Sequence, residues 1–358
     1  MSAETLNASF RSRIAGPNLI PHPACLAIAV RDGTANGTRL MAESGIFSFA
    51  SPDDYCAALR AGTGNLTFIR GGNFNARLTW LNLDNLQMLH GHENLPRIGF
   101  FSLSSEPAFV SFPTNAGAPL TYDGIGLQFG DFVFHSRGER MHQRTGGEGA
   151  WGLISLSPEW LAACSAALAG MPIAVPSEGR VLRPPKRTAR LLLGLHSRIC
   201  SLAETKHERV ANPEVARALA QELVHALINC LTLGDVSGHL KKRRRHHEIM
   251  VQFEDALAAN SDPRLSLPEL CSAIGVPERT LRACCSEFLG MSPTRYHLLR
   301  RLNLARSALR RANPETTSVA EIARNHQFIE LGRFAVAYRT VFGEMPSFTL
   351  RSPRIKTA

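Results

Sequence analysis

The sequence predicts a mixed α+β chain, in which an N-terminal β-barrel or sandwich with helices precedes an all-α domain of two helix-turn-helix units joined by a long helix. Three observations lead to this prediction. Short alternating apolar runs fill residues 1–160, helical periodicity begins after them, and one stretch near the C-terminus is written twice. We therefore divide the 358 residues into a β-rich domain at 1–160, a helical connector at 161–233, a basic linker at 234–247 and the double unit at 248–352.

The composition is that of a globular protein kept in the cytoplasm. No apolar run approaches the roughly 18 residues of a membrane span, and residues 1–13 lack the apolar block of a secretory signal. Eight cysteines are scattered without a C-x-x-C pair, which favours reduced, packed thiols over disulfides or a zinc site. Residues 241–358 carry 20 Lys and Arg against 11 Asp and Glu, whereas residues 1–240 carry 20 against 19. This excess charge indicates a polyanionic partner for the C-terminal third.

The β-rich domain is predicted from the alternation of apolar and polar residues. Every second residue from Phe74 to Trp80 is apolar, as in a half-buried strand. The turn at Gly130-Asp131 before an apolar run resembles the strand entry of cupin barrels, so we expect a cupin-like domain. Further strands are expected at 98–103, 108–112, 125–129, 132–135 and 151–156.

Histidines in this domain raise the question of a metal site. His90 and His92 have the H-x-H spacing of metal-binding cupins, and alternate residues of a strand share one face. Their flanks, Q-M-L and N-L-P, are typical of a loop, and His135 and His142 flank a second polar turn. We therefore expect surface or ligand-contacting histidines, with no metal and no cofactor. No G-x-S-x-G, H-E-x-x-H or phosphate-loop motif is present, so we predict no catalytic residue and no enzyme.

Helical periodicity starts after residue 157. Pro158 is expected to open one helix, residues 187–202 form a second, and Pro213 opens a third whose apolar side carries Val215, Leu219, Leu223, Leu227 and Cys230. This stripe has two candidate partners, the β-rich domain or a second copy of the chain. The segment 234–247 ends in K-K-R-R-R-H-H and is interpreted as a linker that also makes salt-dependent phosphate contacts.

The doubled stretch covers residues 266–293 and 318–346. Each copy has a short amphipathic helix, a tight turn, a second helix and then Gly-x-x-Pro, which is typical of helix-turn-helix units. In the first copy Ser266 is the predicted N-cap, Gly275 supplies a left-handed turn and Pro277 starts the second helix. That helix turns Leu281, Cys284, Cys285 and Phe288 inward and Arg279, Arg282, Ala283 and Ser286 outward.

The two copies are expected to differ in how they read a duplex. Arginines at an exposed helix start, here Arg279 and Arg282, can each bind guanine O6 and N7. In the second copy Phe334, Tyr338 and Val341 form the buried stripe, while Gly332, Ala335, Val336 and Arg339 point outward. We expect the first copy to be the specific reader and the second an anchor. A helix at 294–312, with Leu298, Leu302, Ala305 and Leu309 inward, would hold them about 34 Å apart.

Residues from about 250 to 352 resemble the DNA-binding domain of the AraC/XylS family of bacterial transcription regulators. The resemblance rests on V-P-E-R-T-L-R, L-G-M-S-P-T-R-Y, L-R-R-L-N-L-A-R, S-V-A-E-I-A and F-x-x-x-G-R-F-A-x-x-Y-R-x-x-F-G-E-x-P-S, in that order. The G-R-F-A-x-x-Y-R ending, with a barrel before it, is similar to the branch of ethanolamine-utilisation regulators. The resemblance implies DNA contacts by Arg279, Thr280, Arg282 and Ser286 in the first unit, by Gly332, Val336 and Arg339 in the second, and by Arg295 and Arg333 near phosphates.

Such a regulator would bind promoter or operator double-stranded DNA, act with RNA polymerase as an activator, form a homodimer and take a small-molecule effector in its N-terminal domain. Two departures reduce the expected readout: Ala283 stands where the family often has Arg, and Gln327 replaces the Gly before Phe328. A positive φ at Gln327 would cost about 1 kcal/mol, unless Asn325 takes the left-handed position instead. Two other functions stay open, a metal-dependent cupin-type enzyme with a nucleic-acid-binding appendage, and a basic binder of DNA or RNA without sequence preference.

Overall fold

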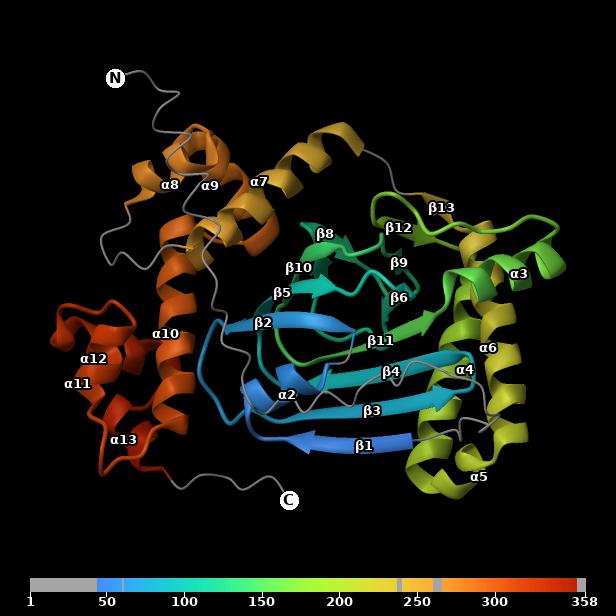
Figure 1. Ribbon diagram of the computed structural model, residues 1–358, viewed down its shortest axis with the longest axis horizontal. Helices are drawn as coiled ribbons and strands as arrows, with labels where there is room; N and C mark the ends of the chain where they lie inside the picture. Colours follow the sequence, from blue (N-terminus) through green and yellow to red (C-terminus); the bar gives the residue numbers. More distant parts are fainter. Residues whose placement is uncertain (1–43, 60, 237–239, 260–265, 353–358) are drawn as a thin grey trace, which may run out of the picture.

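The computed structural model describes residues 44–59, 61–236, 240–259 and 266–352, so the expectation for residues 1–13 lies outside the described part of the chain. The α+β prediction is confirmed: two sheets with their helices come first, and helices alone follow (Figure 1). Across the described segments, none of the helices combines the length and the hydropathy that a bilayer crossing requires.

The N-terminal domain is a sandwich of two sheets with antiparallel strand pairing. The larger sheet has the order β1 (Ser44–Phe49), β3 (Ala76–Leu83), β4 (Leu86–Glu93), β11 (Gly149–Leu156), β6 (Ala108–Pro113), β9 (Phe132–Phe134), β12 (Arg180–Arg183) and β13 (Asp235–Val236). The smaller sheet has the order β2 (Gly62–Phe68), β5 (Arg97–Leu103), β10 (Arg140–Thr145), β7 (Leu120–Tyr122) and β8 (Ile125–Leu127). The strands predicted from apolar runs are therefore confirmed.

Side-chain alternation divides the larger sheet between two hydrophobic cores. On β4, Met88 packs in the core beneath helices α4 (Lys186–Thr205) and α6 (Pro213–Leu233), whereas Leu89 packs in the core between the sheets. The predicted stripe of α6 is used in the first of these cores, where Leu223 and Leu227 are fully buried. Of its two candidate partners, the stripe therefore contacts the β-rich domain. Three shorter helices, α2 (Pro52–Ala58), α3 (Pro158–Ala169) and α5 (His207–Ala211), complete this domain.

The loop predicted around His90 and His92 is wrong. Both residues lie in β4, which is hydrogen-bonded to β3 on one side and to β11 on the other. Gly91 between them is required by packing rather than by a turn, because an added Cβ would overlap the Trp151 indole. The larger sheet also includes β12 and β13, so it reaches beyond residue 160 and into the segment predicted as linker.

The C-terminal third contains the two predicted helix-turn-helix units. Its helices are α7 (Leu240–Ala259), α8 (Leu267–Ile274), α9 (Glu278–Leu289), α10 (Pro293–Arg311), α11 (Val319–Asn325), α12 (Leu331–Phe342) and α13 (Pro346–Arg351). One hydrophobic core lies among α7, α8 and α9, and another among α10 to α13. Among the described residues of the segment predicted as linker, 235–236 lie in β13 and 240–247 lie in α7, so that part is a strand and a helix.

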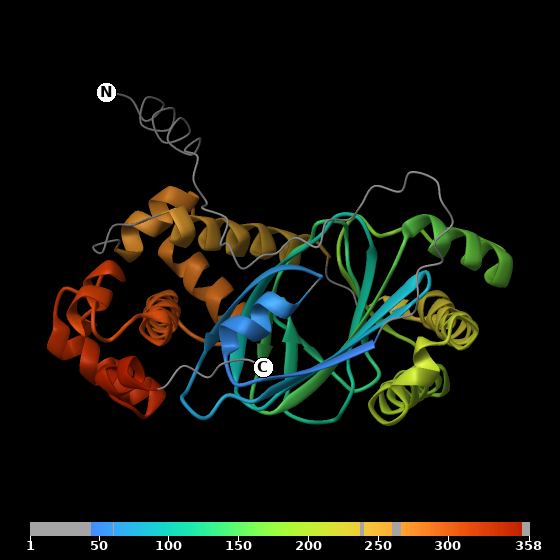
Figure 2. The ribbon, with the colours of Figure 1, turned by 60° about the horizontal axis from the view of Figure 1, so that its bottom comes forward.

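The C-terminal helices pack on the smaller sheet. Ile98 of β5 is buried in the same core as Phe253 of α7 and Phe288 of α9. Figures 1 and 2 show these helices on one side of the sandwich and α4 with α6 on the opposite side. The order of layers is therefore α4 and α6, the larger sheet, the smaller sheet, and the helix-turn-helix units.

Candidate nucleic-acid interface

The first helix-turn-helix unit has the turn chemistry that the sequence predicts. The Ser266 hydroxyl accepts a hydrogen bond from the Glu269 backbone N–H, and the Glu269 carboxylate accepts one from the Ser266 N–H, which is a capping box. Gly275 ends α8 with a φ of 74°, a conformation that favours glycine. Pro277 then caps α9. The entry angle of α9 is thus fixed by local sequence.

Helix α9 presents the predicted face to solvent. Leu281, Cys284, Cys285 and Phe288 are buried, as predicted. Arg279, Arg282, Ala283 and Ser286 are exposed, and Thr280 is half-buried beside them. The sandwich therefore leaves the predicted reading face of α9 open.

Arg282 has a partner that we did not predict. Its guanidinium lies 2.6 Å from the Glu278 carboxylate, one helical turn earlier. The i, i+4 spacing of opposite charges was the available signal for this pair. Because both side chains are exposed, the pair contributes little to stability and orients Arg282 instead.

Helix α12 is the corresponding helix of the second unit. Phe334 and Tyr338 are buried, as predicted. The third residue predicted to be buried, Val341, is half-buried, and its neighbour Phe342 is buried instead. Gly332, Arg333, Val336 and Arg339 are exposed, and Val336 is 68% exposed. Arg333 pairs with Glu330, the N-cap residue three positions earlier, at 2.9 Å. Gly332 and Val336, one helical turn apart, give this face an apolar surface.

In the turn between α11 and α12, the residue with a left-handed conformation is Gln327. Gln327 has a φ of 68°, whereas Asn325 is the last residue of α11, so the Asn325 alternative is wrong. The Arg301 guanidinium of α10 donates to the backbone carbonyls of His326 and Gln327 and lies 4.3 Å from the centre of the Phe328 ring. These contacts hold a turn that carries a strain of about 1 kcal/mol.

Helix α10 joins the two units. Leu302, Ala305 and Leu309 are buried as predicted, but Leu298 is exposed. Arg295 is exposed at the start of the helix, near α9. The single helix α10 thus connects α9 of the first unit to α11 and α12 of the second.

A buried polar cluster joins the first unit to the smaller sheet. The Glu254 carboxylate of α7 accepts a hydrogen bond from the Tyr296 hydroxyl at 2.6 Å and lies 3.0 Å from the His142 ring of β10. Burial alone would raise the pKa of Glu254, but the hydrogen bond and charge of His142, with Arg300 and Tyr296, lower it. The prediction of a surface or ligand-contacting His142 is therefore corrected to a buried interdomain contact.

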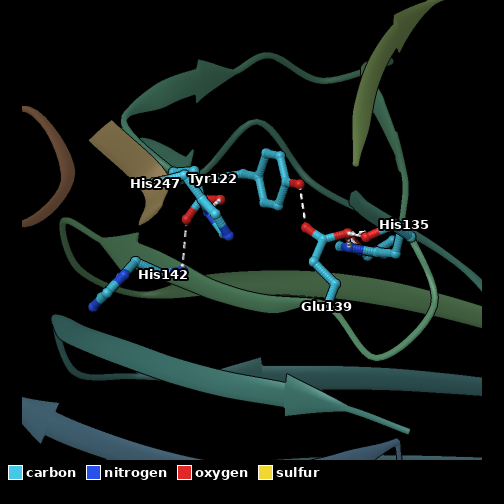
Figure 3. Close-up of polar contacts among 8 residues, drawn as sticks. Tyr122, His135, Glu139, His142 and His247 are labelled. Atoms are coloured by element: carbon cyan, nitrogen blue, oxygen red, sulfur yellow. Dashed lines mark hydrogen bonds and ion pairs between the residues drawn. The ribbon is translucent and has the colours of Figure 1, made fainter. Parts of the chain in front are cut away.

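Asp123 forms a second junction beside this cluster, and Figure 3 labels its partners His142 and His247. Its carboxylate accepts a hydrogen bond from the His142 backbone N–H at 2.7 Å and lies 2.9 Å from Nδ1 of His247. His247 belongs to the basic run at the start of α7. Although burial favours its neutral form, the hydrogen bond and charge of Asp123 raise the pKa of His247. The basic run is thus anchored to the sandwich.

The second unit is joined to the sandwich at the edge strand β2. The Asn303 side chain of α10 both accepts from the Phe68 N–H and donates to the Phe68 carbonyl, each at 3.0 Å. The Ser307 hydroxyl donates to the Asp53 carboxylate at 2.6 Å. The Gly71 N–H donates to the Val341 carbonyl of α12. Both reading units therefore contact the sandwich directly.

Buried polar side chains lie in the interior of the sandwich. His135, predicted at the surface, is fully buried, with its ring 2.7 Å from the Ser111 hydroxyl and 3.4 Å from Glu139, which also accepts from the Tyr122 hydroxyl (Figure 3). The Glu93 carboxylate accepts hydrogen bonds from Arg97, Tyr55 and Trp151.

The cavity between these groups is small, about 50 Å³. A larger cavity of about 390 Å³ lies at the junction of α2, β2 and α10.

His90 and His92 do not form a cupin-type site within the sandwich. They lie on the face of β4 that carries Met88, outside the space between the sheets. His92 is exposed and lies 3.0 Å from Glu148. The H-x-H spacing, which favoured a metal-dependent cupin-type enzyme, therefore does not place these two histidines inside the sandwich. None of the comparisons reported below supports that function.

Comparisons with known proteins match the geometry of the helical domain. A helix-turn-helix domain family matches residues 270–352. The XylDLEGF operon transcriptional activator 2 of Pseudomonas putida is 33% identical over 109 residues, which cover 30% of this chain and 68% of that protein. The probable thc operon regulatory protein of Rhodococcus erythropolis is 36% identical over 160 residues, 42% of this chain and 48% of that protein. The chain spans about half the length of most curated relatives it matches.

One solved structure similar to this chain is a probable AraC family transcriptional regulator from Rhodopseudomonas palustris. The two are 32% identical, the match covers 29% of this chain and 94% of that one, and the TM-score is 0.26. The described C-terminal helices form a double helix-turn-helix domain, the class that transcription regulators use. The chain belongs to the AraC/XylS family of transcriptional regulators.

Proposed function

We propose that the protein regulates transcription by binding promoter or operator DNA through α9 and α12. The observation that carries the proposal is a pair of exposed, arginine-bearing helices joined by the single helix α10. Arg279 and Arg282 would bind base edges, with Thr280 and Ser286 beside them. Gly332, Val336 and Arg339 would lie in the groove as an anchor, and Arg295 and Arg333 would contact phosphates.

The contacts with the sandwich suggest how DNA binding is controlled. The sandwich leaves both reading faces exposed, so it does not act by covering them. It holds the first unit through Glu254 and the second through Asn303. A change in the sandwich would therefore alter the relative orientation of two reading helices that must enter one duplex together.

The cavity of about 390 Å³ is the place we assign to a small effector. It has the size of a small-molecule site, and its walls come from both domains. Arg306, Arg310 and Arg311 line it together with Asp53, so its charge favours an anionic molecule. An effector there would touch α10 directly, and differential binding to two arrangements of α10 would couple it to DNA.

Further parts of the proposal concern partners and location. A homodimer is supported by exposed apolar side chains on the helical layer, among them Leu191 of α4, which is 52% exposed. Contact with RNA polymerase, activation of transcription and a cytoplasmic location are supported by family membership. The G-R-F-A-x-x-Y-R ending supports the finer assignment to the branch similar to ethanolamine-utilisation regulators.

Selection of binding sites from random duplexes tests the proposal. The wild-type protein should enrich a defined sequence, and the variant Arg279→Ala/Arg282→Ala should lose that enrichment while still binding duplexes. Arg190→Ala, an exposed arginine of α4 on the far side of the sandwich, is the matched control. Equal affinity of the wild type for all duplexes would instead establish a basic binder without sequence preference.

A further inference from the structure

Three potential metal ligands meet between β4 and α4, away from the reading helices and the interdomain cavity. They are His90 on the outer face of β4 and His196 and Cys200, one turn apart on α4. One ring nitrogen of each histidine and the Cys200 sulfur all lie within 4.8 Å of one another. Atoms at such separations can share a single ion with little movement, because metal–nitrogen and metal–sulfur bonds are about 2.0 and 2.3 Å long.

The surroundings favour a site rather than ordinary packing. His196 is 1% exposed and Cys200 is 6% exposed. Nδ1 of His90 is buried and has no hydrogen-bond partner among the described residues. A buried polar atom without a partner costs free energy, which a bound ion would recover.

The orientation of His196 also fits a ligand. Its Nε2 lies 3.4 Å from the Leu89 carbonyl oxygen, and its Nδ1 lies 4.0 Å from the Cys200 sulfur. A backbone carbonyl at one ring nitrogen commonly fixes a metal-binding histidine with the other nitrogen free to coordinate.

We propose that His90, His196 and Cys200 form a site for a borderline-soft divalent transition-metal ion of the Zn²⁺ or Co²⁺ type. Two imidazoles and one thiolate suit these ions and not Mg²⁺ or Ca²⁺, which prefer oxygen ligands. The Cys200 thiol would release its proton to solvent as the metal–sulfur bond forms. Glu204, one turn beyond Cys200, pairs with Arg77 at 3.3 Å.

The ion would join α4 to β4. In the described structure these two elements meet there through the contact of His196 with the Leu89 carbonyl and through the His90 and His196 rings, whose centres lie 5.5 Å apart. Metal binding would add a direct link between the helical layer and the larger sheet. This proposal does not depend on the DNA-binding function.

Titration of the metal-free, full-length protein with Co²⁺ tests the site. We expect one equivalent to produce the intense visible bands of four-coordinate Co²⁺ together with the near-ultraviolet thiolate-to-cobalt charge-transfer band. Cys200→Ser should remove the charge-transfer band, and His90→Ala should weaken Co²⁺ binding. His92→Ala and Cys230→Ser are the matched controls, since the His92 side chain is 39% exposed and pairs with Glu148, and Cys230 lies on α6 with its thiol hydrogen-bonded to the Thr188 carbonyl.

Stability measurements keep the test decisive if Cys200→Ser folds poorly. Zn²⁺ should raise the Tm of the wild type and of His92→Ala but not that of His90→Ala. His90 is only half-buried, so this variant should remain folded. Absence of the charge-transfer band in the folded wild type would overturn the proposal, as would a Zn²⁺ response that His90→Ala retains.

Discussion

His142 on β10 and Glu254 on α7 lie 3.0 Å apart across the domain boundary, and each side chain is only 2% exposed. Such a contact is expensive to break, because removing one partner leaves the other polar group buried. We expect His142→Ala to destabilise the protein by about 3 kcal/mol in urea denaturation. His225→Ala, which removes an exposed histidine of α6, should change stability by less than about 0.5 kcal/mol. Similar losses in the two variants would show that the contact contributes nothing specific.

The contributions of His247 and Glu254 to the stability of the protein should depend on pH in opposite directions. His247 has a raised pKa beside Asp123, so its contribution is complete below the ordinary value of 6.5 and is lost as pH rises through the raised value. Glu254 has a lowered pKa, so its contribution is complete above the ordinary value of 4.5 and is lost as pH falls through the lowered value.

Replacement of His247 isolates the alkaline side of this dependence. Between about pH 6 and 9, the Tm of the wild type should fall more than the Tm of His247→Gln. His225→Gln should follow the wild-type profile. A His247→Gln profile parallel to that of the wild type would remove His247 from the pH response.

The two reading helices are expected to contribute unequally. Arg282→Ala should weaken binding to a selected site by about 1–3 kcal/mol and leave binding to random duplex nearly unchanged. Arg339→Ala should weaken binding to both by a similar amount, because α12 is proposed as an anchor. Fluorescence anisotropy with selected and random duplexes at one salt concentration measures both differences. A larger loss of specificity in Arg339→Ala would reverse the assignment.

The local sequence was sufficient to predict the helices and turns of the first helix-turn-helix unit. The i, i+3, i+4, i+7 spacing from Leu281 to Phe288 and the caps at Ser266 and Gly275 depend on neighbours within a few residues, and the structure has them as predicted. The docking of the units was not predictable, because it depends on pairs such as Phe68 with Asn303, which lie 235 positions apart. No periodicity encodes such a distance.

Strand β4 shows the same limit within one domain. It has neighbours on both sides and is buried on both faces, so its sequence around His90 and His92 lacks the clean alternation that predicts a strand. The meeting of His90 with His196 was invisible for the same reason, since α4 follows β4 by about a hundred residues.

The basic run at 241–245 is predicted to contribute non-specific phosphate contacts. The side chains of residues 241–243 lie outside the described part, whereas Arg244 is exposed and pairs with Glu178 at 3.3 Å and with Glu248 at 3.2 Å. Replacing Arg244 and Arg245 by Gln should reduce the slope of log affinity against log salt by about 1 for each DNA phosphate that the variant no longer neutralises. An unchanged slope would assign these two arginines to the junction with the sandwich alone.

The left-handed Gln327 provides a test of the strain in the second unit. Glycine adopts a φ of 68° without steric cost, so Gln327→Gly should stabilise the protein by about 1 kcal/mol. The same substitution at Gln252, an exposed position within α7, should destabilise it by about 1 kcal/mol, because glycine is unfavourable inside a helix. Urea denaturation of both variants gives the two signs. If Gln327→Gly were destabilising instead, Gln327 would have to contribute more to the turn through its side chain than its backbone conformation costs.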